Sequence, residues 1–360
     1  MALNCGIIGL SSTGKTTIFN CISNTKAEIG FASKSNIGMC EVIDERLKLI
    51  DNISHSKRIV PATVEIVDLP GLSKGGQGVG NKLLAEVQTM DALIHVLRCF
   101  DDPNIVHVDG SVNPVRDKEI IDTELQLKDL ETVESRMQRV EKQARVGGDK
   151  QAKIELGVLE AYKAALVEGR SARTVTFETE DELAAAKNLF LLTTKPVLYV
   201  CNVDDASAAN GNAYVEAVRE ATKDEQAALL IISAQTEADI AELESYEEKQ
   251  MFLEDMGLTE SGCDRLIKAI YSLLGLQTFI TAGEMEVKAW TFRRGWKAPQ
   301  CAGVIHTDFE KGFIRAEVIK YEDYIKYGSE AAVREAGKMG VEGKDYVVQD
   351  GDIMHFRFNV

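Results

Sequence analysis

Short apolar runs that end in polar loops recur in two parts of the chain and predict the buried strands of an α/β domain. The runs occupy residues 5–8, 62–67, 92–98, 196–201 and 229–233, and a weaker one at 39–43 fits a short edge strand. Helical patterns lie at 17–23, 83–89, 214–225 and 264–274. We therefore expect an open sheet with helices covering it.

The stretch from 117 to 168 has a different pattern. It is charged, contains no proline and is rich in Leu, Glu, Lys, Gln and Arg, a composition that favours long helices. Its apolar residues recur three and four positions apart, as in a coiled-coil seam, and Gly147 and Gly148 interrupt them. The seam residues are Leu130, Val133, Met137, Val140 and Ala144, then Ile154, Val158, Ala161 and Ala165. We predict an antiparallel helical hairpin, with two ordinary surface helices as the alternative.

From about residue 277 the pattern changes to short strands around one helix at 330–336. The predicted strands are 286–292, 302–306, 312–318, 346–348 and 353–358. This pattern indicates a small α+β domain. The predicted organisation is a main α/β domain over 1–116 and 196–276, a helical insertion over 117–195 and a C-terminal domain over 277–360.

Composition narrows the class of protein. Of the 360 residues, 45% are hydrophobic, which indicates a globular chain, and the net charge of −16 argues against general binding of polyanions. The seven cysteines include no C-x-x-C pair, so neither a zinc site nor a disulfide framework is indicated. No apolar stretch is long enough to span a membrane, so we expect no membrane association and a cytoplasmic location.

The first apolar run leads into a phosphate-binding loop. Residues 9–16 read Gly-Leu-Ser-Ser-Thr-Gly-Lys-Thr and fit G-x-x-x-x-G-K-[ST]. Glycines let the backbone curl around an anion, and the helix that follows offers free amides and its positive dipole end. Lys15 is expected to reach the outer phosphates and Thr16 to ligate Mg²⁺. The predicted nucleotide contacts here are Gly9, Ser11, Ser12, Thr13, Gly14, Lys15, Thr16 and Thr17.

A second motif, D-x-x-G, follows the strand that begins at Ala62. Asp68 is expected to hold Mg²⁺ through water, and the amide of Gly71 to bond the γ-phosphate. Leu72 occupies the place where many GTPases carry a water-positioning Gln, so the catalytic group must come from elsewhere. Gln77 and His107 are the two candidates, although a loop histidine is often simply solvated.

Two further loops are expected to place the base, and one to sense the γ-phosphate. Asn202, Val203 and Asp205 follow one predicted strand, and Ser233 and Ala234 follow another. An open parallel sheet binds its ligand at the carboxyl ends of its strands. In the polar stretch 24–36, Ser33 and Ser35 are candidates to close on Mg²⁺, with ordinary loop serines as the alternative.

Positive charge and an aromatic residue come together at 293–297 of the C-terminal domain, in Arg293, Arg294, Trp296 and Lys297. This combination fits a contact with RNA or protein. Solvated residues at a strand end are the alternative.

Taken together, these motifs resemble the Obg-like ATPase (YchF) family from end to end. The most specific matches are Arg-Cys-Phe-Asp-Asp at 98–102, His-Val-Asp-Gly-Ser-Val-Asn-Pro at 107–114, Lys-Ala-Trp-Thr at 288–291 and the stretch 303–313. The resemblance implies a G-domain-like P-loop NTPase of the translation-factor class, with a coiled-coil hairpin insertion and a β-grasp-like TGS domain at the C-terminus. It also implies association with the ribosome, a preference for ATP over GTP, and the cofactors Mg²⁺ and often K⁺.

The chain departs from the family pattern at several positions. Residues 11–13 replace Pro-Asn-Val, and the lost Asn is the one expected to help hold K⁺, which disfavours a K⁺ requirement. The switch segments around 32–36 and 75–80 look shortened. Asp205 stands where the family has Glu, and a short carboxylate is what guanine recognition uses. We therefore predict a switch protein that slowly hydrolyses ATP, with His107 and Gly71 in the catalytic centre. A GTPase, or a nucleotide-binding scaffold with little turnover, remains the alternative.

Overall fold

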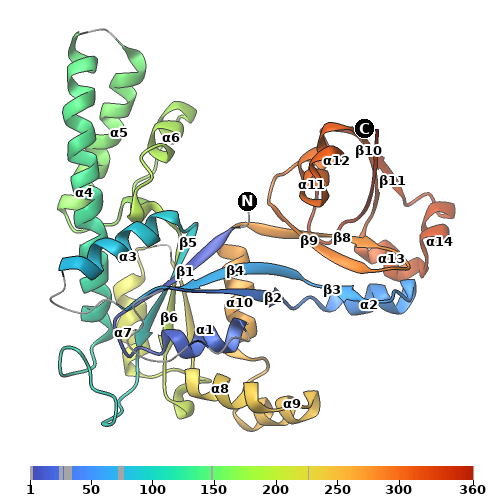
Figure 1. The fold of residues 1–360 in the computed structure, drawn as a ribbon, viewed down its shortest axis with the longest axis horizontal. Helices are drawn as coiled ribbons and strands as arrows, with labels where there is room; N and C mark the ends of the chain where they lie inside the picture. The colour runs from blue at the N-terminus through green and yellow to red at the C-terminus, as the bar shows by residue number, and fades with distance from the viewer. Residues whose placement is uncertain are drawn as a thin grey trace. The chain divides into compact units, whose positions relative to one another are not determined.

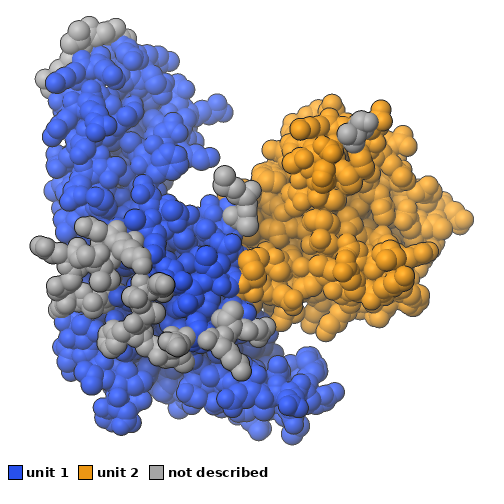
Figure 2. All heavy atoms as spheres, viewed as in Figure 1, with its two compact units in different colours: residues 1–38, 65–266 blue, residues 39–64, 267–360 orange. Residues whose placement is uncertain are grey.

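The computed structural model describes residues 3–23, 27, 35–71, 77–146, 149–225 and 227–359. The chain divides into two compact units (Figure 2). The first unit comprises residues 1–38 and 65–266, and the second comprises residues 39–64 and 267–360. A segment from the first quarter of the chain thus belongs to the same unit as the C-terminal domain.

The first unit is built on a six-stranded sheet with the strand order β2-β4-β1-β5-β6-β7 (Figure 1). Its strands are β1 (Asn4–Ile8), β2 (Asn36–Val42), β4 (Ala62–Asp68), β5 (Ala92–Arg98), β6 (Val197–Asn202) and β7 (Ala228–Ile232). The pairs β1–β4, β1–β5, β5–β6 and β6–β7 are all parallel. The predicted edge strand is present as β2, and the carboxyl ends of β1, β4, β5 and β6 meet at one edge of the sheet.

Helices cover this sheet. They are α1 (Lys15–Ser23), α3 (Gln77–Thr89), α7 (Ala213–Thr222), α8 (Ala234–Glu242), α9 (Tyr246–Asp255) and α10 (Gly262–Leu273). Val87 of α3, Val215 of α7 and Leu125 of the long helix α4 (Pro114–Val146) share one core cluster with Leu93 and Tyr199 of the sheet. Burying this face is what holds the sheet and these three helices together.

The helical insertion rises from the same unit (Figure 1). It contains α4, α5 (Lys150–Val167), α6 (Glu180–Lys187) and the 3₁₀ turns η1 (Ala172–Thr174) and η2 (Leu192–Thr194), while a third turn, η3 (Asp205–Ser207), follows β6. All five predicted seam residues of α4 join a second core cluster, in which Val158 and Leu159 of α5 also take part. Glu134 pairs with Lys163 at 2.8 Å across the two helices. The predicted helical hairpin is therefore present.

The second unit carries a six-stranded sheet with the order β11-β10-β12-β8-β9-β3. Its strands are β3 (Ile59–Val60), β8 (Leu276–Ala282), β9 (Val287–Arg293), β10 (Phe313–Ile319), β11 (Gly340–Glu342) and β12 (Ile353–Phe358). Its helices are α2 (Glu45–Ser54), α11 (Ala298–Ile305), α12 (Thr307–Lys311), α13 (Tyr321–Tyr327) and α14 (Glu330–Glu335). Parallel and antiparallel pairs are mixed, as in β12–β8 and β8–β9.

Two predicted strands of this unit are wrong. Residues 302–306 form the end of helix α11, because Ala298, Cys301 and Ala302 lie on one helical face that packs into the core. Residues 346–348 form only an isolated bridge, in which Val347 pairs with Lys297. In both places a short apolar run was compatible with either element, and the surrounding core decided between them.

No helix among the described parts of the chain is long and apolar enough to cross a membrane.

Candidate active site

The phosphate-binding loop has the backbone that the motif requires. Gly9, Ser12 and Gly14 have φ values of 154°, 62° and 92°, in a region that side chains rarely adopt. A Cβ at Gly9 would lie 2.5 Å from the carbonyl oxygen of Val96, and one at Gly14 would lie 2.3 Å from Nδ2 of Asn202. Both glycines are therefore needed, since the loop is pressed against the neighbouring strands, and α1 begins directly after it.

Lys15 lies at the mouth of this loop and is 6% exposed. Its Nζ donates a hydrogen bond of 2.6 Å to the carbonyl oxygen of Leu10. Burial lowers the pKa of Lys15 to about 8, although the negative charge of Asp68 opposes this change. The loop therefore holds a poorly solvated cation, which a phosphate group would stabilise.

The D-x-x-G motif meets the phosphate-binding loop. A Cβ at Gly71 would lie 3.0 Å from Oγ of Ser11 and 3.1 Å from Nζ of Lys15. Only a residue without a side chain allows this close approach. The predicted association of Gly71 with the phosphate end of the site therefore has a geometric basis.

Thr16 and Asp68 lie together at the same end. Thr16 Oγ1 donates a hydrogen bond of 2.8 Å to Asp68 Oδ2. Asp68 Oδ1 is buried and has no hydrogen-bond partner among the residues described by the structure. Burial raises the pKa of Asp68, against the opposing effects of Thr16 and Lys15. A hydroxyl and a carboxylate with an unsatisfied oxygen are the hard ligands that Mg²⁺ prefers, so these residues fit that ion.

Asn202 ties three segments together. Its Nδ2 donates to the carbonyl oxygen of Thr13 at 2.9 Å, and its Oδ1 accepts from the backbone N–H of Ala234 at 2.9 Å. The backbone N–H of Val203 bonds the carbonyl oxygen of Ile232. Because both ends of the Asn202 amide are used in this way, Asn202 fixes the two base loops against the phosphate-binding loop.

Asp205 joins the two base loops at the surface. Its Oδ1 accepts hydrogen bonds from Ser233 Oγ at 2.6 Å and from Thr236 Oγ1 at 2.7 Å. Ser233 also caps α8 by accepting from the backbone N–H of Thr236. These contacts orient the carboxylate of the exposed Asp205, and neither of them uses its second oxygen.

His107 is held in a loop near the start of α4. The backbone N–H of Asp109 donates to Nδ1 of His107 at 3.0 Å, so Nε2 carries the ring proton and donates to Asp117 Oδ2 at 2.8 Å. Asp117 is fully buried and also pairs with Arg116 at 2.9 Å. Both ring nitrogens thus already make hydrogen bonds. For a role in catalysis, His107 would have to break its hydrogen bond to Asp117. That role stays a prediction.

Several other predicted residues are placed as follows. Thr17 is half-buried in the first turn of α1. The hydroxyl of Ser35 donates to the carboxylate of Glu86 on α3. Ser33, Leu72 and the side chain of Gln77 lie outside the described part of the structure.

Two residues of the predicted positive cluster at 293–297 already make contacts within the second unit. Lys297 pairs with Asp345 at 2.7 Å, and Trp296 packs against the core of this unit.

Sequence reasoning missed Arg98, at the end of β5. Arg98 is 2% exposed and donates to the carbonyl oxygens of Phe100, Asp102 and Ile105, at 3.1, 3.2 and 2.9 Å. It thereby shapes the loop that carries His107. A charged residue at the end of an apolar strand was the signal, because a buried arginine must find partners.

Two known protein families match parts of the chain. Residues 4–139 match a family described as "50S ribosome-binding GTPase". Residues 276–359 match the C-terminal family of YchF GTPases, described as "Protein of unknown function (DUF933)". The two matches cover the phosphate-binding loop, the D-x-x-G motif and most of the second unit, and leave the base loops at 202–205 and 233–234 outside.

Individual relatives match the whole chain. The ribosome-binding ATPase YchF of Bacillus subtilis is 50% identical over 100% of both chains. Obg-like ATPase 1 of Gallus gallus is 40% identical, over 99% of this chain and 93% of that protein. The solved structure of the Schizosaccharomyces pombe YchF GTPase is 34% identical and superposes with a TM-score of 0.88, over 99% of this chain and 97% of that one. Matches of this extent and identity mean that the chain belongs to the YchF family of Obg-like ATPases.

Proposed function

We propose that the protein binds Mg·ATP at residues 9–16, hydrolyses it slowly to ADP and phosphate, and acts as a nucleotide-dependent switch on the ribosome. The observation that carries the proposal is the meeting of Lys15, the Thr16–Asp68 pair and Gly71 at one end of the sheet. The relatives' names, which include "ribosome-binding ATPase", support the reaction and the partner.

In this proposal one set of residues contacts the phosphates and another positions the base. Lys15 neutralises the outer phosphates, and the amide of Gly71 senses the γ-phosphate. Thr16 and Asp68 would hold Mg²⁺, which would supply charge neutralisation for the phosphates. Asn202 positions the loops that contact the base.

A calorimetric titration with non-hydrolysable ATP and GTP analogues tests the binding step. The wild-type protein with Mg²⁺ should bind the ATP analogue more tightly, and Lys15→Ala should show no measurable affinity for either. Lys153→Ala, at an exposed position of α5, is the matched control and should bind as the wild type does. Normal binding by Lys15→Ala would contradict the assignment of residues 9–16 as the nucleotide site.

GTP is the second candidate substrate. The contacts from Ser233 and Thr236 both go to one oxygen of Asp205, which leaves the other oxygen for a ligand. Guanine presents paired donors that a carboxylate can accept, and adenine does not. Tighter binding of the GTP analogue in the same titration would make the protein a GTPase.

A K⁺ requirement is not part of the proposal. Ser12 occupies the position of the family's loop Asn, and the neighbouring Thr13 hydroxyl bonds the carbonyl oxygen of Leu10. The side chain of Ser12 is shorter than that of Asn. Hydrolysis rates measured in K⁺ and in Na⁺ at equal ionic strength should therefore be similar.

Ribosome association also implies a cytoplasmic location. Residues 277–360 are the proposed TGS domain, and Arg293 and Arg294 are its proposed contacts with rRNA. Cosedimentation with ribosomes tests this part, with Arg294→Glu as the variant. Undiminished cosedimentation of that variant would remove the rRNA contact from the proposal and leave the nucleotide chemistry untouched.

A further inference from the structure

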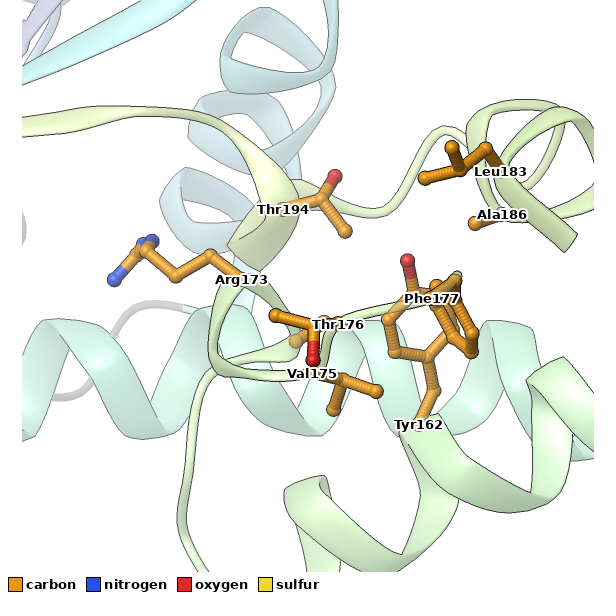
Figure 3. Close-up of a pocket in the computed structure, with 9 residues that line it drawn as sticks. Tyr162, Arg173, Val175, Thr176, Phe177, Leu183, Ala186 and Thr194 are labelled. Atoms are coloured by element: carbon orange, nitrogen blue, oxygen red, sulfur yellow. The ribbon is translucent and has the colours of Figure 1, made fainter. Parts of the chain in front are cut away.

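A pocket of about 330 Å³ lies in the helical insertion, and none of its residues belongs to the nucleotide site (Figure 3). Its walls include Tyr162 of α5, Phe177 of the segment after η1, and Leu183 and Ala186 of α6. The volume is at the lower end of the range for ligand pockets, which suits one anchoring side chain better than a whole cofactor.

Most of the lining is apolar or aromatic, and Arg173, Thr176 and Thr194 are its other residues. The rings of Tyr162 and Phe177 meet edge to face, with centroids 5.2 Å apart and planes at 87°. Leu183 is 51% exposed on the wall formed by α6. An incoming apolar side chain would cover Leu183 and add to the aromatic contacts, which is the usual source of affinity at an anchor pocket.

The hydroxyl of Tyr162 supplies a polar handle. Tyr162 is 4% exposed, yet its hydroxyl makes no hydrogen bond within the part of the chain that the structure describes. Figure 3 shows the hydroxyl pointing toward the side of the pocket where Thr194 and Ala186 lie. Burial, and then Asp129, raise the pKa of Tyr162 to about 12, so it is a neutral donor. The hydroxyl is therefore available to donate a hydrogen bond to a ligand in the pocket.

The chain segment between the lining residues Phe177 and Leu183 is acidic. Glu178, Glu180 and Asp181 are exposed in the short segment that joins Phe177 to Leu183. Arg173, the cation among the lining residues, donates to the carbonyl oxygen of Lys195 at 3.2 Å and lies 3.7 Å from Glu225. Its side chain points away from the two rings in Figure 3. Glu178, Glu180 and Asp181 therefore favour a cationic ligand and repel nucleic-acid phosphates.

We propose that this pocket binds a basic peptide segment of a partner protein, with one large apolar side chain inserted between Phe177 and Leu183. A backbone carbonyl of the segment accepts a hydrogen bond from Tyr162. Flanking lysine or arginine side chains pair with Glu180 and Asp181. This binding does not depend on the proposed nucleotide chemistry.

Fluorescence anisotropy with the full-length protein tests the proposal. The probe is a fluorescein-labelled peptide of the sequence Gly-Lys-Lys-Phe-Lys-Lys-Gly, compared with peptides that carry Ser for Phe or Glu for each Lys. The Phe peptide should bind at least about tenfold more tightly than the Ser peptide, since a large apolar side chain is buried. The Glu peptide should not bind, and added salt should weaken the Phe peptide.

Three variants assign the binding to the pocket. Tyr162→Phe, which removes one hydroxyl and no packing, should weaken the Phe peptide about fivefold, as expected for one hydrogen bond. Leu183→Ser should weaken it more. Glu180→Lys combined with Asp181→Lys should abolish binding. All three should bind the ATP analogue as the wild type does, which shows that they are folded.

Four results would overturn the proposal. They are no binding of the Phe peptide at millimolar protein, equal binding of the Phe and Ser peptides, undiminished binding by Tyr162→Phe together with Leu183→Ser, and displacement of the Phe peptide from wild-type protein by a uridine oligonucleotide. The last result would assign the surface to RNA instead.

Discussion

The hydroxyl of Thr16 donates a hydrogen bond of 2.8 Å to the carboxylate of Asp68, although 52 positions separate the two residues in the chain. Thr16 lies in the first turn of α1, and Asp68 is the last residue of β4. The parallel pairing of β1 with β4 brings their carboxyl ends together. This pair is the proposed Mg²⁺ site, and four experiments test it and its surroundings.

Asp68→Asn should remove the dependence of nucleotide binding on Mg²⁺. The amide oxygen can still accept the hydrogen bond from Thr16, but the charge that attracts the ion is lost. Titration of the ATP analogue with Mg²⁺ and with EDTA should give similar affinities for this variant and a clear difference for the wild type. Glu65→Gln, at a half-buried position of the same strand, should retain the wild-type response. A retained response in Asp68→Asn would contradict the metal site.

Lys15→Met should stabilise the nucleotide-free protein while abolishing nucleotide binding. The pKa of Lys15 is about 8 in the folded protein and about 10.5 when unfolded. Between these values the unfolded chain binds the extra proton, so wild-type stability should rise with pH in this window. Below pH 8 the buried charge destabilises the fold, and its removal, less the lost hydrogen bond to Leu10, should add about 1 to 2 kcal/mol.

Urea unfolding at neutral and at alkaline pH measures this effect. The difference between Lys15→Met and the wild type should shrink as the pH rises above 8. Lys153→Met, on the exposed surface of α5, should not change the pH profile. A difference that stays constant with pH would mean that Lys15 is not a destabilising buried charge.

Asp205→Glu should shift base preference further toward ATP. The longer side chain moves the carboxylate away from the position that Ser233 and Thr236 define at 2.6 and 2.7 Å. Competition titrations should show affinity for the GTP analogue falling about fivefold or more relative to the ATP analogue, the loss expected for one misplaced hydrogen bond to a charged group. Asp204→Glu, next to it in the chain, should leave the ratio unchanged. An unchanged ratio in Asp205→Glu would remove Asp205 from base selection.

His107→Ala should slow hydrolysis and leave nucleotide binding unchanged. General acid–base catalysis by one side chain contributes about a hundredfold or more, so the rate of phosphate release should fall by about that factor. Val106→Ala, which alters an 82% exposed neighbour in the same loop, should hydrolyse ATP normally. If His107→Ala lowers the melting temperature but not the rate, His107 is a structural partner of Asp117 only.

The parts of the protein that depend on local sequence were predictable. The phosphate-binding loop needs glycine at positions 9 and 14, where φ is positive and a Cβ would clash, and a helix must follow it directly; the sequence of residues 9–16 indicates both features. The seam of α4 was equally visible, because helical spacing alone puts Val133 and Val140 on one face. Families with such local signatures can be recognised from a single chain.

Other parts were decided by tertiary structure. The strand predicted at 302–306 is a helix, because the core of the second unit selects the face formed by Ala298 and Ala302. Residues 39–64 belong with the C-terminal unit, where β3 pairs with β9, although they lie inside the first predicted domain. Spacing along the chain carries no information about such distant pairings.

The candidate active site shows the same division between what the sequence determined and what the tertiary structure decided. The residue types proposed to bind phosphate, Mg²⁺ and base were determined by the sequence, because each lies in a short motif with its own backbone chemistry. Only the fold decided that His107 donates a hydrogen bond to Asp117, and that Ser233 and Thr236 both donate to Asp205. It also decided that Tyr162 lines a pocket. Hydrogen bonds and burial between distant residues arise from packing, and no local pattern records them.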